Sequence, residues 1–365
     1  MKAVVHLGLA KTGSTSVQQW LLWNTAALSA RGIAFDCSEP PECSQDKEFQ
    51  GLAITARELC GKMTGDSTLK RSQGIHDRAA QRAFAERYSA FFADLVRSHD
   101  EDTFVISCEY LGMNTRDVRE ATIIHNWLGN HFDEVRYVMY LRRQEEWLAS
   151  SYCERVKRGS TKTLDDLVAS SAAQDWHHRA AIWAGAAGQD AVDVRLLEDD
   201  VLGKGGLIGD FARIIGTTPE GLAPAERVNE SLSAPAAELL RVLNDTIPHT
   251  NKAGTKVNPR KRRLRSILFA QDLDMPKVRL DPAQVATVRA ANAASNERLR
   301  AAFFPDRQEL FPPRPEGTGA HRAQTPADVA VVAGNMITEI DRRRRKAKTA
   351  PPRADPRATH PERSA

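Results

Sequence analysis

The sequence has no apolar run long enough to cross a membrane, although 41% of its 365 residues are hydrophobic. Its first residues lack the charged segment followed by an apolar segment that marks a secretory leader. The five cysteines are odd in number and irregular in spacing, which fits neither a disulfide framework nor a zinc site. We therefore expect a cytoplasmic protein with reduced thiols, no transmembrane segment and no bound metal.

An excess of charge of one sign is also missing from most of the chain. The formal net charge is +4, but residues 313–365 hold eleven Lys or Arg against six Asp or Glu, so residues 1–312 carry −1. A nearly neutral body has no electrostatic footprint for nucleic acid, and no nucleic-acid partner is expected. The run Arg342–Lys346 is interpreted as a solvated helix end.

Five short β-like runs alternate with helical patterns. They are Ala3–Leu7, Ile33–Phe35, Thr103–Ser107, Val135–Leu141 and Ala191–Leu197. Such alternation predicts a three-layer α/β/α fold with a mostly parallel sheet of about five strands. In sheets of this kind, ligands bind beyond the carboxyl ends of the strands.

Apolar spacing and capping residues predict the main helices. One begins near Ser14 and stops before Gly32, and one begins near Glu145. The others cover about Asp77–Ser98, Arg116–Gly129, Ala234–Asn244 and Pro282–Phe303.

These patterns predict one α/β domain over residues 1–304, with an insertion at 37–73 and a mainly helical part at 219–304. Four prolines and two glycines indicate a linker at 305–324. A basic helix is expected over 325–347 and a disordered tail over 348–365.

The most informative segment is the turn at residues 6–16, His-Leu-Gly-Leu-Ala-Lys-Thr-Gly-Ser-Thr-Ser. It joins the first strand to the first helix, where unpaired backbone N–H groups and the positive helix end favour an anion. The usual nucleotide-triphosphate motif needs Lys directly after its second Gly, whereas Lys11 precedes Gly13 by two residues. The turn therefore predicts an anion site for a different transferred group, with a plain capped helix start as the alternative.

A second anion site is predicted at the end of the fourth strand. Arg142 ends that strand, and Ser150 lies on the following helix. In a parallel sheet this end reaches the same edge as Lys11, and a guanidinium fork with a nearby hydroxyl suits a phosphate. The alternative is a surface arginine paired with Glu145 or Glu146.

With both segments in hand, the chain resembles the sulfotransferases that use 3′-phosphoadenosine 5′-phosphosulfate (PAPS). Members of that family carry a Lys-Thr-Gly-Thr-Thr-like loop, matched here by Lys11–Ser16, that binds the 5′-phosphosulfate. They also carry an Arg at a later strand end and a Ser eight residues on, which bind the 3′-phosphate and are matched by Arg142 and Ser150. The resemblance covers about residues 1–245.

The chain departs from the family pattern at Ala10 and Gln144, where many relatives have Pro. Both departures concern the stiffness of a turn more than contact with a ligand.

The resemblance implies a P-loop-like fold, PAPS as sulfuryl donor, 3′,5′-adenosine bisphosphate (PAP) as product, and a hydroxyl or amine acceptor on a small molecule or glycan. It implies that the nucleotide is bound by Lys11, Thr12, Gly13, Ser14, Thr15, Ser16, Arg142 and Ser150. Lys11 would stabilise the leaving phosphate during in-line transfer. Glu109, just after the third strand, is the candidate general base, with a solvated loop carboxylate as the alternative.

Other interpretations stay open. A P-loop phosphotransferase would need Lys after Gly13 and an acid at a strand end to hold magnesium. A non-catalytic nucleotide-binding protein of the same fold would keep Lys11 and Arg142. The basic stretch Lys252–Arg265 is either a solvated loop or a cover for the 3′ side of the nucleotide, as a later basic loop is in relatives. His6 is interpreted as a packed residue, and the acceptor and oligomeric state carry no signature.

Overall fold

The structure is a computed structural model that describes residues 1–41, 48–65, 67–225, 232–250, 257–270, 275–313 and 325–349. The chain divides into two compact units. The first comprises Met1–Ser151, Leu164–Asn229 and Leu280–Ala320, and the second comprises Tyr152–Thr163, Glu230–Arg279 and His321–Ala365. Most of the expected linker and all but the first residues of the expected tail lie outside the described residues.

The first unit is built on one parallel sheet with the strand order β2-β3-β1-β4-β5. The strands are β1 (Lys2–His6), β2 (Ile33–Ala34), β3 (Thr103–Ser107), β4 (Glu134–Leu141) and β5 (Val192–Leu196). Each strand end lies within one residue of its expected position, which confirms the predicted parallel α/β fold. Because His6 is in register with Ser107 and Val138, β1, β3 and β4 reach the same edge of the sheet.

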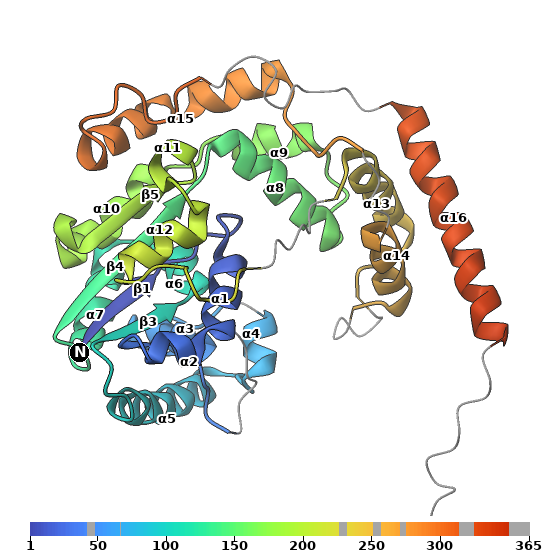
Figure 1. The fold of residues 1–365 in the computed structure, drawn as a ribbon. Coiled ribbons are helices and arrows are strands. Elements are labelled where there is room, and N and C mark those ends of the chain that lie inside the picture. Colours follow the sequence, from blue (N-terminus) through green and yellow to red (C-terminus); the bar gives the residue numbers. More distant parts are fainter. Residues whose placement is uncertain are drawn as a thin grey trace, which may run out of the picture. The chain divides into compact units, whose positions relative to one another are not determined.

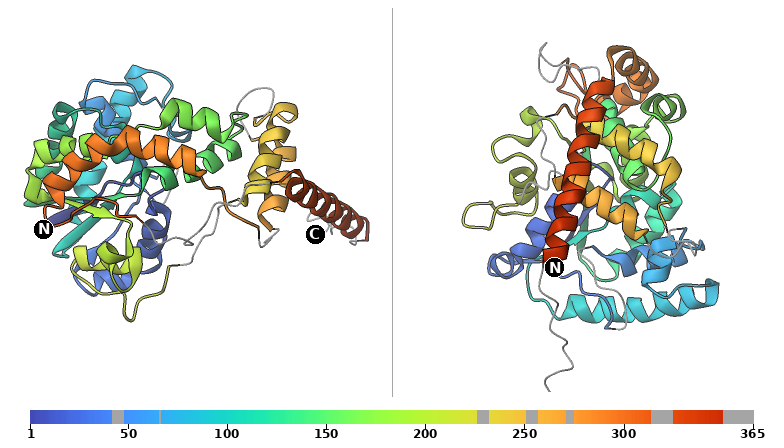
Figure 2. Two further views of the ribbon diagram at one scale, coloured as in Figure 1. Left: turned by 90° about the horizontal axis from the view of Figure 1, so that it is seen from above. Right: turned by 90° about the vertical axis from the view of Figure 1, so that its right-hand side faces the viewer.

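Helices cover both faces of this sheet and give the first unit three layers (Figures 1 and 2). On one face, Phe211 packs edge-on against His6 of β1 and against Trp20. On the other face, Tyr137 of β4 packs against Trp183 and His125. The helices nearest the first face are α1 (Ser14–Trp23), α2 (Thr25–Ser29), α11 (Asp199–Leu202) and α12 (Gly206–Ile214). The second face carries α3 (Gln50–Leu59), α5 (Arg78–Arg97), α7 (Val118–Gly129) and α10 (Trp176–Ala187).

Side-chain caps explain why several helices begin where they were expected. Asp77 accepts a hydrogen bond from the Ala80 N–H at the start of α5. Asp281 and Gln284 form a reciprocal capping box at the start of α15 (Pro282–Phe303). The remaining helices of the first unit are α4 (Ser67–Ser72), α6 (Glu109–Asn114), α9 (Leu164–Ser171), the 3-10 turn η1 (Gln189–Ala191) and most of α8 (Gln144–Lys157). Residues 37–73 thus contribute α3 and α4, and α3 packs against α5, α6 and α7.

The second unit is helical. It holds the end of α8 together with α13 (Ala234–Thr246), α14 (Pro259–Ala270) and α16 (Pro326–Thr349), and α16 packs against α13 and α14. From Pro259 on, the solvated-loop interpretation of the basic stretch is wrong, because Pro at a first helical position and a run of good helix formers start α14. In the described part of the chain, no helix is both long and apolar enough to cross a membrane.

Candidate functional site

The loop between β1 and α1 holds two residues in the left-handed backbone region. Gly13, the N-cap of α1, has φ 91°, and Lys11 has φ 69°. A side chain at position 13 would be strained at this φ, and its Cβ would also overlap the Leu207 side chain, so position 13 favours glycine. Lys11 is the one non-glycine residue with positive φ in the described part of the chain, a conformation that costs a side-chain-bearing residue about 1–2 kcal/mol. Strain of this kind is concentrated at functional sites.

The loop presents backbone donors at the start of α1. Among the described residues, the N–H groups of Gly13, Ser14 and Thr15 donate to no backbone carbonyl, whereas the Ser16 N–H is bonded to the Gly13 carbonyl. The Thr12 hydroxyl is buried and donates to the Leu9 carbonyl at 2.7 Å, so Thr12 closes the loop from inside. The three unused N–H groups and the positive helix end suit a phosphate.

Glu109 lies against this loop. It begins α6, directly after β3, and one of its carboxylate oxygens accepts a hydrogen bond from the Ser14 hydroxyl. Two glycines permit the approach: a Cβ on Gly8 would lie 2.8 Å from the Glu109 Cγ, and a Cβ on Gly112 would lie 2.8 Å from the Gly8 carbonyl oxygen. The structure therefore brings together two predicted site residues that are far apart in sequence.

Arg142 and Ser150 are held on the other side of β1. Arg142 directly follows β4, and its Nε donates to Glu146 Oε2 at 2.9 Å, which is the surface pairing considered as the alternative. Ser150 is half-buried on α8. Among the described residues, no hydrogen bond joins Arg142 to Ser150 or either of them to the Lys11–Ser16 loop.

Two tryptophans connect the loop with the Arg142 segment. The Trp147 indole N–H donates to the Ala10 carbonyl at 2.8 Å, and the Trp176 indole N–H donates to the Arg142 carbonyl at 2.9 Å. The two rings meet edge to face, with centroids 5.7 Å apart. Sequence reasoning missed both residues. Trp147 lies in the segment that drew attention to Arg142, but no local pattern indicates Trp176.

His6 is the last residue of β1 and packs beneath the Lys11 loop in the core. It is fully buried between Tyr140 and Phe211, and its Nδ1 lies 2.9 Å from the Ser107 hydroxyl oxygen. Burial lowers the pKa of His6 to about 4, so the ring is neutral near pH 7. The packed role expected for His6 is confirmed, and its contact with Ser107 joins the ends of β1 and β3 just before the Lys11 loop and Glu109.

The buried His6 predicts loss of stability in mild acid. The unfolded chain binds a proton below its pKa of 6.5, whereas the folded chain resists protonation down to about 4, so stability is complete above pH 6.5 and falls as the pH drops toward 4. At pH 5 the loss from this residue is about 2 kcal/mol. Urea unfolding of the wild type and of His6→Asn at pH 7.5 and pH 5 measures it. The variant should show a smaller pH difference, and an equal difference in both proteins would contradict the assignment.

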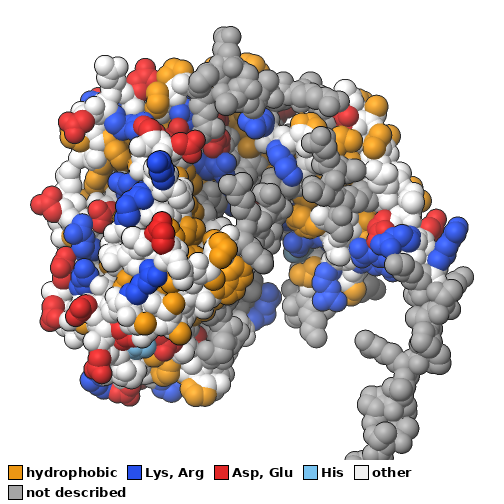
Figure 3. Space-filling view, viewed as in Figure 1, with side chains coloured by type: hydrophobic (Ala, Val, Ile, Leu, Met, Phe, Trp, Pro, Cys, Tyr) orange, Lys and Arg blue, Asp and Glu red, His pale blue; other side chains and the backbone are white. Residues whose placement is uncertain are grey.

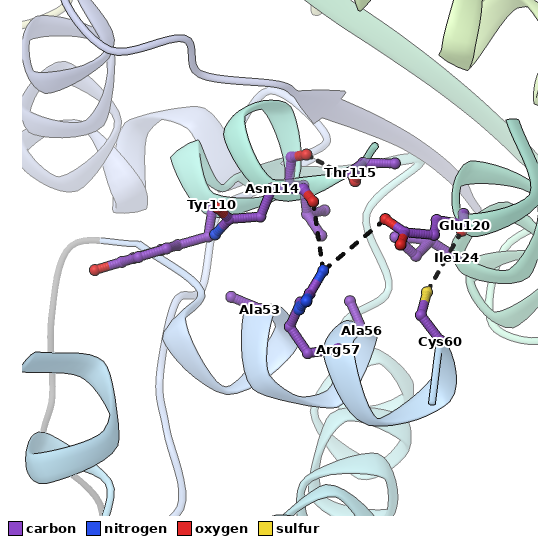
Figure 4. A pocket seen from close by; sticks show the side chains of 10 residues that line it. Ala53, Ala56, Arg57, Cys60, Tyr110, Asn114, Thr115, Glu120 and Ile124 are labelled. Carbon is purple, nitrogen blue, oxygen red and sulfur yellow. Dashed lines mark hydrogen bonds and ion pairs between the residues drawn. The ribbon is translucent and has the colours of Figure 1, made fainter. Parts of the chain in front are cut away.

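A small pocket lies between α3, α6 and α7, and none of the predicted site residues lines it (Figure 4). Arg57 lies 3.5 Å from the Asn114 carbonyl oxygen and 3.9 Å from Glu120 Oε2. The buried Glu120 carboxylate also pairs with Lys62 and accepts the Arg116 backbone N–H. We interpret this pocket as the surface of an internally satisfied ionic cluster.

In comparisons with known proteins, no family model, no curated protein and no solved structure matches the chain. The geometry around Lys11, Ser14 and Glu109 therefore carries the functional interpretation.

Proposed function

We propose that the first unit is a PAPS-dependent sulfotransferase that acts on a hydroxyl or amine of a small molecule or glycan. The observation that supports this most directly is the contact between Ser14 and Glu109. It sets a carboxylate beside a loop that offers three backbone donors and a lysine. Anion binding and proton removal, the two requirements of sulfuryl transfer, are thus met by neighbouring groups.

In this proposal, the Lys11–Ser16 loop binds the sulfuryl donor and Glu109 acts on the acceptor. PAPS supplies an activated sulfuryl group. The N–H groups of Gly13, Ser14 and Thr15 hold the 5′-phosphate, and Lys11 stabilises the negative charge that gathers on the bridging oxygen as the bond to sulfur breaks. Glu109 takes the acceptor's proton as the new bond to sulfur forms. A sulfuryl group carries less negative charge than a phosphoryl group, so a fixed lysine can take the place of a divalent cation.

The 3′-phosphate is assigned to Arg142 and Ser150. The bond from Arg142 to Glu146 joins side chains that are 34% and 25% exposed, and ion pairs at such positions contribute little. Arg142 can therefore exchange Glu146 for a phosphate, with which it forms a stronger two-pronged interaction. This assignment sets the protein apart from one that binds a nucleotide only through its 5′ end.

The carboxylate nearest the end of β5, that of Glu198, is already paired with an arginine, which favours sulfuryl transfer over magnesium-dependent phosphoryl transfer. Glu198 follows that strand closely and is bound in a two-pronged ion pair by Arg143, with both N–O distances at 2.7 Å. Both side chains are buried, so releasing Glu198 to a magnesium ion would leave an arginine charge uncompensated. A magnesium-dependent phosphotransferase is therefore the weaker proposal.

Ligand-induced thermal shifts test the nucleotide assignment. PAP should stabilise the protein more than AMP or ATP with magnesium, and Arg142→Ala should remove the advantage of PAP over AMP. A charge-assisted contact with phosphate is worth about 1.5–3 kcal/mol, so the variant should bind PAP at least about tenfold more weakly. Arg136→Ala removes the same charge from a half-exposed position on β4, where the side chain pairs with Asp193, and should leave the ranking unchanged. A larger shift with ATP and magnesium would favour the phosphotransferase instead.

A further inference from the structure

The second unit contains a group of basic side chains that the proposed reaction does not use. His249 follows α13, and Lys261 and Arg265 lie one turn apart on α14. We call these three residues the α14 cluster. The Lys261 side chain is fully buried and donates to the Ile247 carbonyl at 3.2 Å.

The α14 cluster has polar atoms without partners. His249 Nδ1 and Arg265 Nε are both buried, and neither makes a hydrogen bond. Across the described ranges, Arg265 forms no ion pair and Lys261 meets no carboxylate. Burying a charged or polar group without a partner is costly, so these atoms indicate a missing acceptor.

The charged side chains that act on the α14 cluster are positive, like those of the cluster itself. Burial lowers the pKa of His249 most, and Arg265, Lys261 and Arg158 lower it further. Burial, followed by the charge of Arg265, also lowers the pKa of Lys261. Of these cations, Arg158 is bonded to a carboxylate, that of Glu154. Repulsion within the α14 cluster is therefore uncompensated.

The α14 cluster is bordered by the backbone at Gly159 on one side and by exposed arginines of α14. Gly159 follows α8 and has φ 104°. It packs closely against His249, because a Cβ on Gly159 would lie 2.7 Å from the His249 Cβ. Arg260, Arg262 and Arg263 are exposed on α14. Figure 3 shows Lys and Arg side chains gathered on the surface of this unit. Such a surface attracts anions from solution.

We propose that the α14 cluster binds a phosphate or sulfate group through His249, Lys261 and Arg265. An oxyanion of this kind presents several acceptor lone pairs on a small tetrahedral centre, so it can accept from the ring N–H, the ammonium group and the guanidinium group together. Its charge also offsets the repulsion between Lys261 and Arg265. The site lies in the second unit and is independent of the proposed nucleotide site.

Calorimetric titration of the full chain tests this proposal. The probes are inorganic phosphate, sulfate and phenyl phosphate at constant ionic strength. The protein carries Arg142→Ala, which removes the proposed 3′-phosphate site, and any binding at the Lys11–Ser16 loop is common to all variants compared. Phosphate should bind, and Arg265→Gln should weaken it at least tenfold. Arg263→Gln removes the same charge from an exposed position of the same helix and should change the affinity less than twofold.

The choice of probe and of variant distinguishes the possible ligands. Tighter binding of phenyl phosphate than of phosphate would identify the group as part of an organic ligand, and the reverse order would identify the free ion. His249→Gln, a second variant for the case that Arg265→Gln does not fold, should weaken binding several-fold. Equal losses in Arg263→Gln and Arg265→Gln, or no binding by the Arg142→Ala protein, would overturn the proposal. Neither result bears on PAP binding by the first unit.

Discussion

Lys11→Gly should lower the rate of sulfuryl transfer about 10²–10³-fold and leave the protein at least as stable as the wild type. Removing one preorganised donor from a transition state lowers turnover about 10²–10³-fold. Lys11 has φ 69°, which is unfavourable for lysine and freely accessible to glycine. The relief of strain therefore offsets the entropy that glycine loses on folding. Turnover with PAPS and a panel of acceptors, together with the thermal midpoint, measures both effects.

Lys11→Ala is the matched control for this prediction. It removes the same charge but keeps a Cβ in the left-handed region, so it should lose as much activity as Lys11→Gly and be less stable than that variant. Turnover near the wild-type level in either variant would contradict the catalytic role of Lys11. Equal stability of the two variants would contradict the strain at this position.

Glu109→Gln should lower turnover about 10²–10⁴-fold and change PAP affinity less than twofold. The amide can still accept the hydrogen bond from Ser14, so the loop keeps its shape, but it no longer takes a proton from the acceptor. Single-turnover rates with PAPS and equilibrium binding of PAP separate these effects.

Glu134→Gln serves as the control for Glu109. It removes the same charge from the exposed beginning of β4, at the opposite edge of the sheet, and should leave turnover unchanged. Unchanged turnover in Glu109→Gln would assign the base to another residue. A parallel loss of PAP affinity would mean that Glu109 supports the loop rather than the chemistry.

The sheet and the main helices could be predicted because their signals are local. The apolar run Thr103–Ser107 coincides with β3, and Pro282–Phe303 coincides with α15, which opens with a capping box. The short helix α6 was not predicted, because six residues are too few to show a helical period. Glu109 was therefore expected at the correct edge of the sheet but without the helix that orients it.

The contacts that complete the site depend on tertiary packing. The approach of α6 to the loop requires glycine at positions 8 and 112, which are far apart in sequence. The bond from Trp176 to the Arg142 carbonyl joins the first residue of α10 to the loop between β4 and α8. No periodicity indicates that Lys11 adopts a left-handed conformation, since lysine rarely does so.

The charge pattern of Lys252–Arg265 did not predict which of its cations is buried. A run of Lys and Arg normally indicates a solvated segment. Lys261 lies within that run and is fully buried, and its ammonium group donates a hydrogen bond to the Ile247 backbone carbonyl. Burial of a single cation inside a basic run follows from the fold and not from composition.

The most direct test of the central claim follows the sulfuryl group itself. Radiolabelled PAPS is incubated with the wild type and a panel of hydroxyl and amine acceptors in the presence of EDTA, and PAP and labelled product are quantified. PAP and sulfated acceptor should form in equal amounts with the wild type, and both should form at least about a hundredfold more slowly with Lys11→Gly. Unconsumed PAPS, together with magnesium-dependent transfer of phosphate from ATP, would contradict it.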